Sequence, residues 1–419
     1  MIIKPAKRTL SVEEYYFSKK LREVGELSAT RLAKGEDAII NLGIGSPNGM
    51  PPTSSIEALI EGAKNKSNHA YQSYVGLPEF RAAFSSWYKK YYRVELDPAT
   101  EIQPLAGSKE GILLISLAFI DPGDKVLVPN PGYPTYSASS KFVGAEVISY
   151  ELSEERRWEP DFDALEKMDL SGVKIMWTNY PHMPTGAAAS MELYKKLVNF
   201  GKKHNILICN DNPYSFILND KPLSILEVEG AKDVCLELNS LSKAHNMAGW
   251  RLGMVAAQAP IIKEILKVKS QMDSGMFKPL QLAAIKALEE GWDWFKDLNE
   301  EYLRRRKIAG EIFDIIGAKY DHNSSGMFLW GNVSESKLSV EEKAAPQACE
   351  KVDLRTHEEG NEVANRTPGE VVSDYLLYNK GVFITPGFIF GNQGGNYIRI
   401  SLCASEEVLE KAKNKIRSI

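Results

Sequence analysis

Residues 173–211 contain two strand-like runs separated by one helical run, and this order determines the fold that the sequence predicts. The first run is "VKIMWTNYP" (173–181), the helical run is "MELYKKLVNFGKKH" (191–204), and the second strand-like run is "ILICND" (206–211). The outer runs are short and apolar, whereas the central run has apolar residues at helical spacing. A strand, a helix and a strand in succession are typical of two parallel strands joined by a crossover helix.

The same alternation extends from about residue 105 to residue 257. Further strand-like runs are "KVLVPN" (125–130), "VCLELNS" (234–240) and "LGMVAA" (252–257). Such a succession predicts a mostly parallel sheet covered on both faces, and ligands of these sheets bind beyond the carboxyl ends of the strands. Polar or turn residues follow most of these runs, so we expect a shared site at that edge of the sheet.

The chain is longer than the roughly 250 to 300 residues at which one hydrophobic core stops growing, so we expect two domains. We predict an N-terminal arm with part of the small domain over residues 1–45. A large domain then covers residues 46–290, and a small C-terminal domain covers residues 291–419. A polar stretch at about 334–369 is typical of a surface insertion or loop.

Composition excludes several classes of partner. A net charge of −4 and a pI near 6.0 give no electrostatic reason to expect nucleic acid or an anionic membrane. The apolar run at 111–120 is too short to cross a bilayer, and residues 1–20 lack a signal-peptide core. The four cysteines are widely spaced, which indicates free thiols and argues against a metal site. We therefore expect a soluble, cytoplasmic protein.

The stretch "NSLSKAHNMAGWRLG" (239–253) places Lys243 in a small polar turn and Arg251 eight residues later. A lone lysine is most often a solvated surface residue. An alternative hypothesis explains the whole group: Lys243 forms a Schiff base with pyridoxal phosphate, while Ser240, Ser242 and Arg251 bind the phosphate. Arginine suits this role because its planar guanidinium can bind two phosphate oxygens at once.

Other strand ends meet the demands of this hypothesis. The cofactor's ring nitrogen requires a buried carboxylate, which Asp211 in "NDNPY" can supply, and the Tyr214 phenol could bond the 3′ oxygen of the ring. The phosphate requires backbone amides at a helix N-terminus, where Gly107, Ser108 and Lys109 precede an apolar helix. Each residue alone has an ordinary explanation, such as a turn aspartate or a helix-capping serine.

Two more residues extend the group. Tyr133 in "NPGYPTY" could cover the face of the ring, although a turn tyrosine that packs on its neighbours is an equally fair interpretation. Arg399 in "YIRISLC" lies inside an otherwise apolar strand, where arginine is more often a ligand or part of a buried ion pair than a solvated residue. Arg399 would suit the α-carboxylate of an amino acid.

On these motifs the chain resembles the class I/II aminotransferases, which are fold-type I pyridoxal-phosphate enzymes of the aspartate aminotransferase-like superfamily. The resemblance runs from "NLGIGSPN" to "YIRISLC". "SLSKAHNMAGWRLG" is similar to the family's lysine signature, and "DNPY", "GSK" and "PGY" are similar to its cofactor-binding segments. The resemblance implies an α/β fold with a doubly wound, mostly parallel sheet in a large cofactor-binding domain, plus a smaller α+β domain.

The resemblance adds roles for two other segments. "AYQSYVGLPEFR" is similar to the segment whose tyrosine, here Tyr71, reaches the phosphate bound by the neighbouring subunit, which implies a homodimer. "GIGSP" is similar to the loop whose glycine, here Gly45, approaches the substrate carboxylate. "YIRIS" is similar to the strand whose arginine, here Arg399, binds that carboxylate.

The implied activity is the transfer of an amino group between an L-amino acid and a 2-oxo acid by a ping-pong mechanism through the Lys243 Schiff base. Lys243 would also move the proton of the substrate α-carbon. Another reaction of the same fold, such as C–S lyase or elimination chemistry, uses nearly the same residues. A non-catalytic sensor would need a DNA-binding module, and the residues ahead of position 40 do not supply one.

Two features leave the substrate and one cofactor contact open. Met183 in "NYPHMPTG" stands where the family has an asparagine that bonds the 3′ oxygen, and His182 could replace that donor. No arginine is found where dicarboxylate-specific members have one. Asp273 in "QMDSGMF" would favour a diaminopimelate-like or lysine-like substrate if it reached the neighbouring subunit's site, but a surface aspartate is the simpler interpretation. Aspartate, alanine, methionine and aromatic substrates stay open.

Overall fold

The structure is a computed structural model that describes residues 3–10, 12, 14, 16–338 and 366–417. Residues 339–365, which are most of the predicted insertion, lie outside the described residues. The chain divides into two compact units. The first comprises Met1–Val12, Ser46–Tyr302 and Ser325–Met327, and the second comprises Glu13–Gly45, Leu303–Ser324 and Phe328–Ile419.

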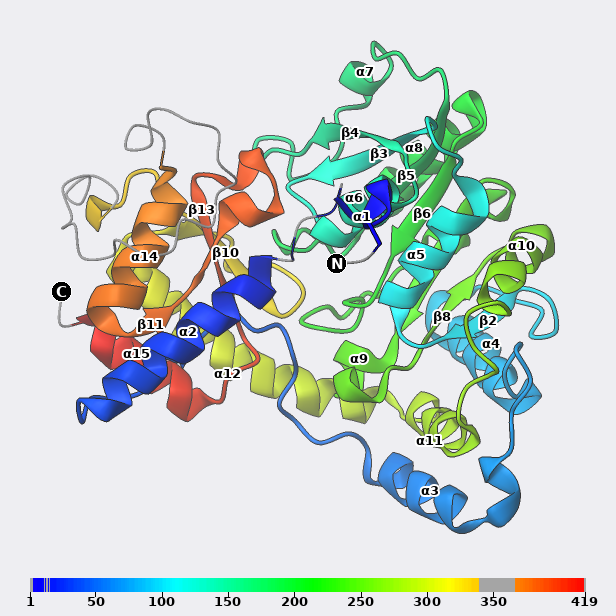
Figure 1. Ribbon diagram of the computed structural model, residues 1–419, viewed down its shortest axis with the longest axis horizontal. Helices are drawn as coiled ribbons and strands as arrows, with labels where there is room; N and C mark the ends of the chain where they lie inside the picture. The colour runs from blue at the N-terminus through cyan, green and yellow to red at the C-terminus, as the bar shows by residue number, and fades with distance from the viewer. Residues whose placement is uncertain (1–2, 11, 13, 15, 339–365, 418–419) are drawn as a thin grey trace. The chain divides into compact units, whose positions relative to one another are not determined.

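The first unit is built on a mostly parallel sheet (Figure 1), which confirms the predicted α/β fold. The strand order is β2-β8-β7-β6-β5-β3-β4. β8 runs antiparallel to both of its neighbours, and the other pairs are parallel. The strand bounds are β2 (Ile102–Leu105), β3 (Lys125–Asn130), β4 (Glu146–Glu151), β5 (Val173–Thr178), β6 (Leu207–Asp211), β7 (Cys235–Ser240) and β8 (Gly253–Ala256).

The helix predicted at 191–204 is confirmed as α8 (Met191–His204), and local sequence explains both of its ends. The Ser190 hydroxyl accepts a hydrogen bond from the backbone N–H of Leu193, and Asn205 ends the helix in the left-handed conformation. Other helices of this unit are α1 (Lys7–Leu10), α3 (Thr53–Lys64), α4 (Pro78–Tyr92), α5 (Ser108–Phe119), α6 (Pro134–Phe142), α7 (Phe162–Leu165), α9 (Leu241–Ala244), α10 (Ala259–Lys269) and α11 (Lys278–Leu288). α12 (Trp292–Ile316) begins in the first unit and ends in the second.

Side chains alternate between the two faces of the sheet, and the two faces differ in chemistry. Leu236 and Leu238 of β7 belong to a hydrophobic cluster that includes buried residues of α5, α6 and α10. Glu237, between them, points to the opposite face, where it meets Tyr88 of α4. One face of the sheet is therefore an apolar core, and the other contains buried polar groups.

The second unit contains a smaller antiparallel sheet with the order β12-β13-β10-β9 and a parallel pair, β1 with β11. Its strands are β1 (Ile40–Asn41), β9 (Lys319–Tyr320), β10 (Phe328–Asn332), β11 (Val382–Phe383), β12 (Thr385–Pro386) and β13 (Tyr397–Ser401). Its helices are α2 (Tyr16–Ala33), the later part of α12, α14 (Pro368–Lys380) and α15 (Glu406–Arg417). Strands and helices of this kind form the predicted α+β domain.

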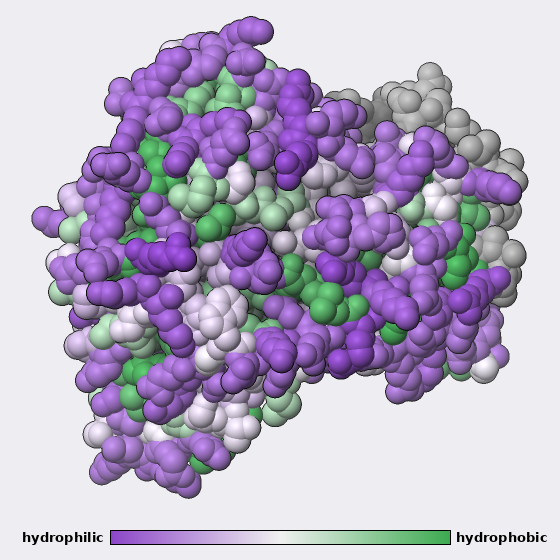
Figure 2. Space-filling view, turned by 180° about the vertical axis from the view of Figure 1, so that it is seen from behind, coloured by the Kyte–Doolittle hydropathy of each residue, from purple (hydrophilic) through white to green (hydrophobic). Residues whose placement is uncertain are grey.

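The surface shown in Figure 2 is mainly hydrophilic, with hydrophobic residues in small, separate patches. Among the described residues, none of the helices combines the length and the hydrophobicity that a membrane crossing requires.

Glu237 is a fully buried carboxylate at the centre of the polar face. Its Oε1 accepts hydrogen bonds from the hydroxyls of Tyr88 (2.9 Å) and Ser224 (2.8 Å). Its Oε2 accepts from Asn210 Nδ2 (3.0 Å) and from the backbone N–H of Ile225 (3.1 Å). Burial raises the pKa of Glu237 above its ordinary value, and these hydrogen bonds oppose the rise. The carboxylate is thus fully bonded but costly to ionise.

We expect Glu237→Gln to make stability less dependent on pH. The amide can keep all of these partners, because the two hydroxyls can accept as well as donate. Since the folded pKa is raised, the wild type loses stability relative to the variant as pH rises from about 4.5 through that pKa. Thermal unfolding of both proteins between pH 4.5 and 8 measures this, and a pH-independent difference in Tm would contradict it. Glu237→Leu, which leaves the donors unsatisfied, should cost about 2 to 5 kcal/mol.

Candidate active site

The carboxyl ends of β6, β7 and β2 meet the start of β8 at one edge of the large sheet. Asp211 is the last residue of β6, and Ser240 is the last residue of β7. Lys243 follows in α9, directly after β7. Gly253, the first residue of β8, pairs with both Ser240 and Leu105, the last residue of β2. Sheet register therefore gathers these predicted site residues at the edge where ligands bind in such folds.

Gly253 allows two of these segments to approach each other closely. A Cβ atom at this position would lie 2.7 Å from the Asn239 carbonyl oxygen and 3.0 Å from the backbone nitrogen of Ser108. The end of β7 and the start of α5 could not be so close with a side chain between them. Gly253 was not among the predicted site residues, although a glycine inside an apolar strand often marks a close backbone approach.

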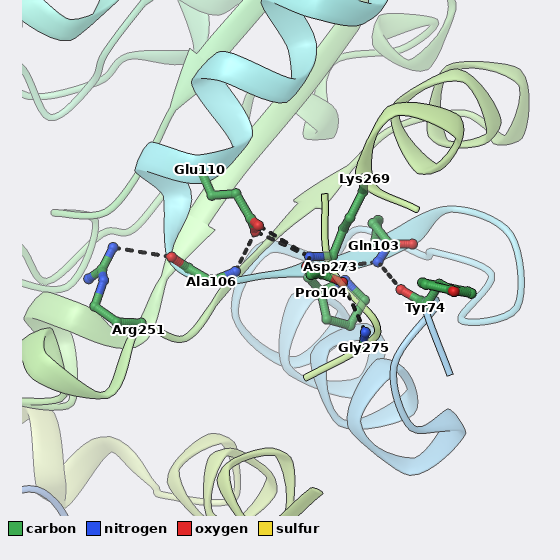
Figure 3. A network of polar contacts seen from close by, with 9 residues as sticks. All are labelled: Tyr74, Gln103, Pro104, Ala106, Glu110, Arg251, Lys269, Asp273 and Gly275. Atoms are coloured by element: carbon green, nitrogen blue, oxygen red, sulfur yellow. Dashed lines mark hydrogen bonds and ion pairs between the residues drawn. The ribbon is translucent and has the colours of Figure 1, made fainter. Parts of the chain in front are cut away.

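Arg251 lies against the turn that begins α5. Its Nη2 donates to the Ala106 carbonyl oxygen at 3.3 Å (Figure 3), and its Nη1 donates to the Ala248 carbonyl oxygen at 2.9 Å. Gly107, which precedes α5, has a φ of 83°, and a side chain there would collide with the Arg251 guanidinium. The guanidinium and the N-terminus of a twelve-residue helix therefore lie together, and both attract anions.

The turn that carries Lys243 is fixed by short hydrogen bonds. The Ser240 hydroxyl accepts from the backbone N–H of Ser242 at 3.1 Å, and the two hydroxyl oxygens lie 2.8 Å apart. Trp294 Nε1 donates to the Ala244 carbonyl oxygen at 2.7 Å at the other end of the turn. Both serines are buried, whereas Lys243 is partly exposed.

Asp211 is 4% exposed, and its two carboxylate oxygens have different surroundings. Oδ2 accepts a hydrogen bond from the Tyr136 hydroxyl at 2.9 Å. Oδ1 is buried and has no hydrogen-bond partner within the part of the chain that the structure describes. Burial, with a smaller contribution from the Glu237 charge, raises the pKa of Asp211 to about 7, and the Tyr136 hydroxyl, the Lys243 ammonium and the Ser108 hydroxyl oppose the rise. A buried carboxylate of this kind fits a cationic N–H donor such as a protonated pyridine ring.

The donor set therefore fits pyridoxal phosphate. Asp211 offers an acceptor for a pyridinium N–H, and Lys243, which lowers the pKa of Asp211, is close enough to interact with it. The turn at Gly107 and the guanidinium of Arg251 offer donors for a phosphate. Ser108 begins α5, and the next residue, Lys109, has an exposed side chain. The individual binding roles of these residues remain predictions.

Tyr136 is a site residue that the sequence analysis missed. It lies on α6, is 1% exposed, and stacks on Trp177 with ring centroids 5.1 Å apart and planes 4° apart. Tyr133, the residue that precedes α6, meets the Tyr136 ring edge-on at 5.5 Å. The available signal was the second aromatic of "NPGYPTY", one helical turn after Tyr133. Trp177 thus holds Tyr136 in position to donate to Asp211.

Met183, which stands where the family has an asparagine, lies in a loop that is held by hydrogen bonds of Asn179. The backbone N–H of Met183 donates to Asn179 Oδ1 at 2.8 Å, and Asn179 Nδ2 donates to the backbone carbonyl of Asp211. His182 is buried, with Nδ1 at 2.8 Å from the Thr185 hydroxyl, and burial lowers its pKa to about 3. Within the described residues, Nδ1 thus has a partner in its own loop, whereas the buried Nε2 has no hydrogen-bond partner. The idea that His182 replaces the missing asparagine stays a prediction. Tyr214 lies in the turn after β6 and is partly exposed.

In the second unit, Arg399 is a buried residue of β13 with an aromatic environment. Its Nη2 donates to the Gly43 carbonyl oxygen at 2.9 Å. A Cβ atom at Gly45 would lie 2.5 Å from the Phe328 ring, so Gly45 and Arg399 contact the same side chain. The guanidinium carbon lies 4.0, 4.7 and 5.5 Å from the ring centroids of Phe328, Phe390 and Phe17. A desolvated guanidinium binds a carboxylate strongly.

Tyr71 and Asp273 are the last two predicted residues, and both belong to the first unit. Tyr71 is 91% exposed, in the loop between the short helix Lys66–His69 and α4. Asp273 forms an ion pair with Lys269 and accepts from the backbone N–H of Gly275 at 2.9 Å. Because Lys269 already neutralises Asp273, the structure does not favour Asp273 as the partner of a substrate ammonium group.

The chain is similar to known proteins over nearly its whole length. The profile of the family described as aminotransferase class I and II matches residues 37–416. A relative named LL-diaminopimelate aminotransferase from Maridesulfovibrio salexigens is 39% identical, over 99% of this chain and 99% of the relative. One of the same name from Dehalococcoides mccartyi is 38% identical, over 99% of this chain and 98% of the relative. A solved structure described as substrate-bound BacF from Bacillus subtilis is 33% identical, with a TM-score of 0.85, and covers 100% of this chain and 98% of its own.

We expect Tyr136→Phe to weaken the binding of pyridoxal phosphate by about tenfold at pH 7, because the carboxylate of Asp211 loses a hydrogen-bond donor. That donor lowers the pKa of Asp211, so its removal raises the pKa further. The loss should therefore shrink as pH rises to 9, where the carboxylate is ionised in both proteins. Absorbance titration of the cofactor-free proteins across this range measures the effect.

Tyr150→Phe is the matched control for that experiment. Tyr150 is also a buried tyrosine, but its hydroxyl donates to the Trp177 carbonyl oxygen at 2.7 Å and not to Asp211. Equal losses of cofactor affinity in the two variants would contradict a specific role of Tyr136.

Proposed function

The chain belongs to the aminotransferase class I and II family, and from that premise we propose that it transfers an amino group of LL-diaminopimelate to a 2-oxo acid. It is a pyridoxal-phosphate-dependent aminotransferase that acts on an amino acid and a 2-oxo acid. The choice of substrate is supported by the relatives of that name, which match nearly the whole chain at 38 to 39% identity. One observation supports the catalytic assignment above all: among the described residues, the buried Oδ1 of Asp211 has no hydrogen-bond partner, and Lys243 is close enough to lower the pKa of this carboxyl group.

When bound, pyridoxal phosphate supplies an aldehyde that accepts amino groups and a ring that withdraws electrons from the substrate α-carbon. Asp211 would accept the pyridine N–H through Oδ1, and the Tyr214 hydroxyl would bond the 3′ oxygen. Tyr133 would cover the ring face. The phosphate would be bound by the turn of Gly107, Ser108 and Lys109 and, from the other side, by Ser240, Ser242 and Arg251.

Lys243 has the central chemical role in this proposal. Its Nζ would bind the aldehyde in the resting enzyme and, once an amino acid displaces it, carry the proton removed from the α-carbon. The turn of α9 suits this task, because Ser240 caps one end and Trp294 bonds the other while Lys243 stays partly exposed. Arg399 would bind the α-carboxylate, with Gly45 leaving room beside it.

A donor panel tests the activity and the substrate together. With 2-oxoglutarate as acceptor, we expect LL-diaminopimelate to give a kcat/KM about 100-fold above those of aspartate, alanine and phenylalanine, because distal polar groups allow strong discrimination. Lys243→Ala should abolish transfer and leave the circular dichroism spectrum unchanged. A faster reaction with another donor would contradict the proposed substrate. Release of ammonia without any 2-oxo acid would indicate elimination chemistry instead.

We also propose that the chain forms a homodimer in which Tyr71 completes the phosphate site of the partner. Tyr71 is 91% exposed, and large apolar side chains on nearby loops, namely Tyr74, Met272 and Phe277, are between 40% and 51% exposed. Gly275, next to these residues, packs against the backbone of Gln72. Such a group of exposed aromatic and methionine side chains is typical of a surface that a partner covers.

Subunit mixing tests the shared site. Tyr71→Ala and Lys243→Ala homodimers should each have little activity. After the two proteins are unfolded together and refolded, random pairing should restore about a quarter of the wild-type activity, because each mixed dimer contains one intact site. Activity that stays at the level of the separate variants would contradict the proposed role of Tyr71.

A further inference from the structure

Lys269, the last residue of α10, is a fully buried lysine behind the turn at the start of α5. Its Nζ lies 3.3 Å from Glu110 Oε1 and 3.4 Å from Oε2, and it forms a second ion pair with Asp273. Figure 3 shows these side chains as one network that extends to Arg251. A buried ammonium costs several kcal/mol unless it is paired, so the two carboxylates account for its burial.

Glu110 connects this lysine to the predicted phosphate site. Glu110 Oε2 accepts a hydrogen bond from the backbone N–H of Ala106 at 2.6 Å, and the Ala106 carbonyl oxygen accepts from Arg251 Nη2. Ala106 directly precedes Gly107, so both polar groups of its backbone are held as the chain enters the turn. If the Glu110 carboxylate moved, the backbone N–H of Ala106 would lose its hydrogen-bond acceptor.

Asp273 connects the same lysine to the segment that carries Tyr71. Asp273 Oδ1 accepts from the backbone N–H of Gly275, whose φ is 88°. A side chain at Gly275 would collide with the carbonyl oxygens of Gln72 and Ser73, so the two loops pack backbone against backbone. Lys269 therefore lies between the turn at α5 and the loop next to Tyr71.

We propose that Lys269 is a positioning residue for the cofactor's phosphate. Through Glu110 it holds the turn at Ala106 and Gly107 in its phosphate-binding geometry, and through Asp273 it holds the loop beside Tyr71. Its positive charge also offsets two carboxylates close to the site of a phosphate dianion. This inference rests on the proposed assignment of the phosphate site, but it does not depend on which amino acid is the substrate.

The test compares the affinities of wild type and Lys269→Met for pyridoxal phosphate and for pyridoxal, which lacks the phosphate. Removal of the ammonium leaves the half-buried carboxylates of Glu110 and Asp273 without their shared cation, beside the proposed phosphate site. We expect the affinity for pyridoxal phosphate to fall about 10- to 100-fold and the affinity for pyridoxal to change by less than about threefold. Equal losses for both ligands would show a merely structural role and overturn the proposal.

Three further variants sharpen the comparison. Lys267→Met is the matched control, because Lys267 lies on the same helix but is exposed and pairs with Glu264; it should bind both ligands as the wild type does. Lys269→Met combined with Asp273→Asn should recover part of the lost affinity, because one uncompensated charge is gone. Glu110→Gln keeps an oxygen acceptor for Ala106 but loses the ion pair.

Glu110→Gln also serves if Lys269→Met does not fold. It should show a several-fold loss that is again confined to the phosphorylated ligand. An unchanged ratio of the two affinities in Glu110→Gln would overturn the proposal. Because only cofactor binding is measured, failure here is distinct from failure of the donor panel, which reports on the substrate.

Discussion

The site depends on a buried carboxylate, that of Asp211, whose Oδ1 has no hydrogen-bond partner among the residues that the structure describes. The cost of placing Asp211 in the interior is reflected in its pKa of about 7. Neighbouring elements reduce this cost only in part: α6 supplies the Tyr136 hydroxyl, and β5 fixes that ring through Trp177. A cationic ring that donates to Oδ1 would remove the remaining cost, so the folded chain and its cofactor should stabilise each other.

The two faces of the large sheet support Asp211 in different ways. β6 and β7 direct Cys209, Leu236 and Leu238 into the hydrophobic cluster, which fixes the strand positions. Asn210 and Glu237, on the opposite face, form a bonded polar layer under α4 and α8. At their carboxyl ends, β6 and β7 finish in the polar residues Asp211 and Ser240. The apolar face therefore supplies most of the stability, and the strand ends supply the chemistry.

Periodicity and composition predicted the elements well, because the strand and helix patterns between residues 125 and 257 are local. The sheet order, with β8 antiparallel, could not be predicted, since the pairing of distant strands leaves no local pattern. Tyr136 and Lys269 were missed for the same reason: their partners, Asp211 and Glu110, are 75 and 159 positions away. For Asp273 the sequence left a substrate role and a surface position open, with the surface position the simpler interpretation. Its ion pair with Lys269 could not be predicted, because that pair has no distinctive sequence signal. The roles of the individual site residues stay predictions.

The exposure of Tyr71 has a consequence for how the protein behaves on dilution. If its hydroxyl completes a phosphate site on a second subunit, then cofactor binding and dimer formation are thermodynamically coupled, and each makes the other more favourable. The cofactor would then hold the subunits together, and the subunits would hold the cofactor. Loss of pyridoxal phosphate would favour dissociation, and a dilute solution would lose its cofactor more readily than a concentrated one.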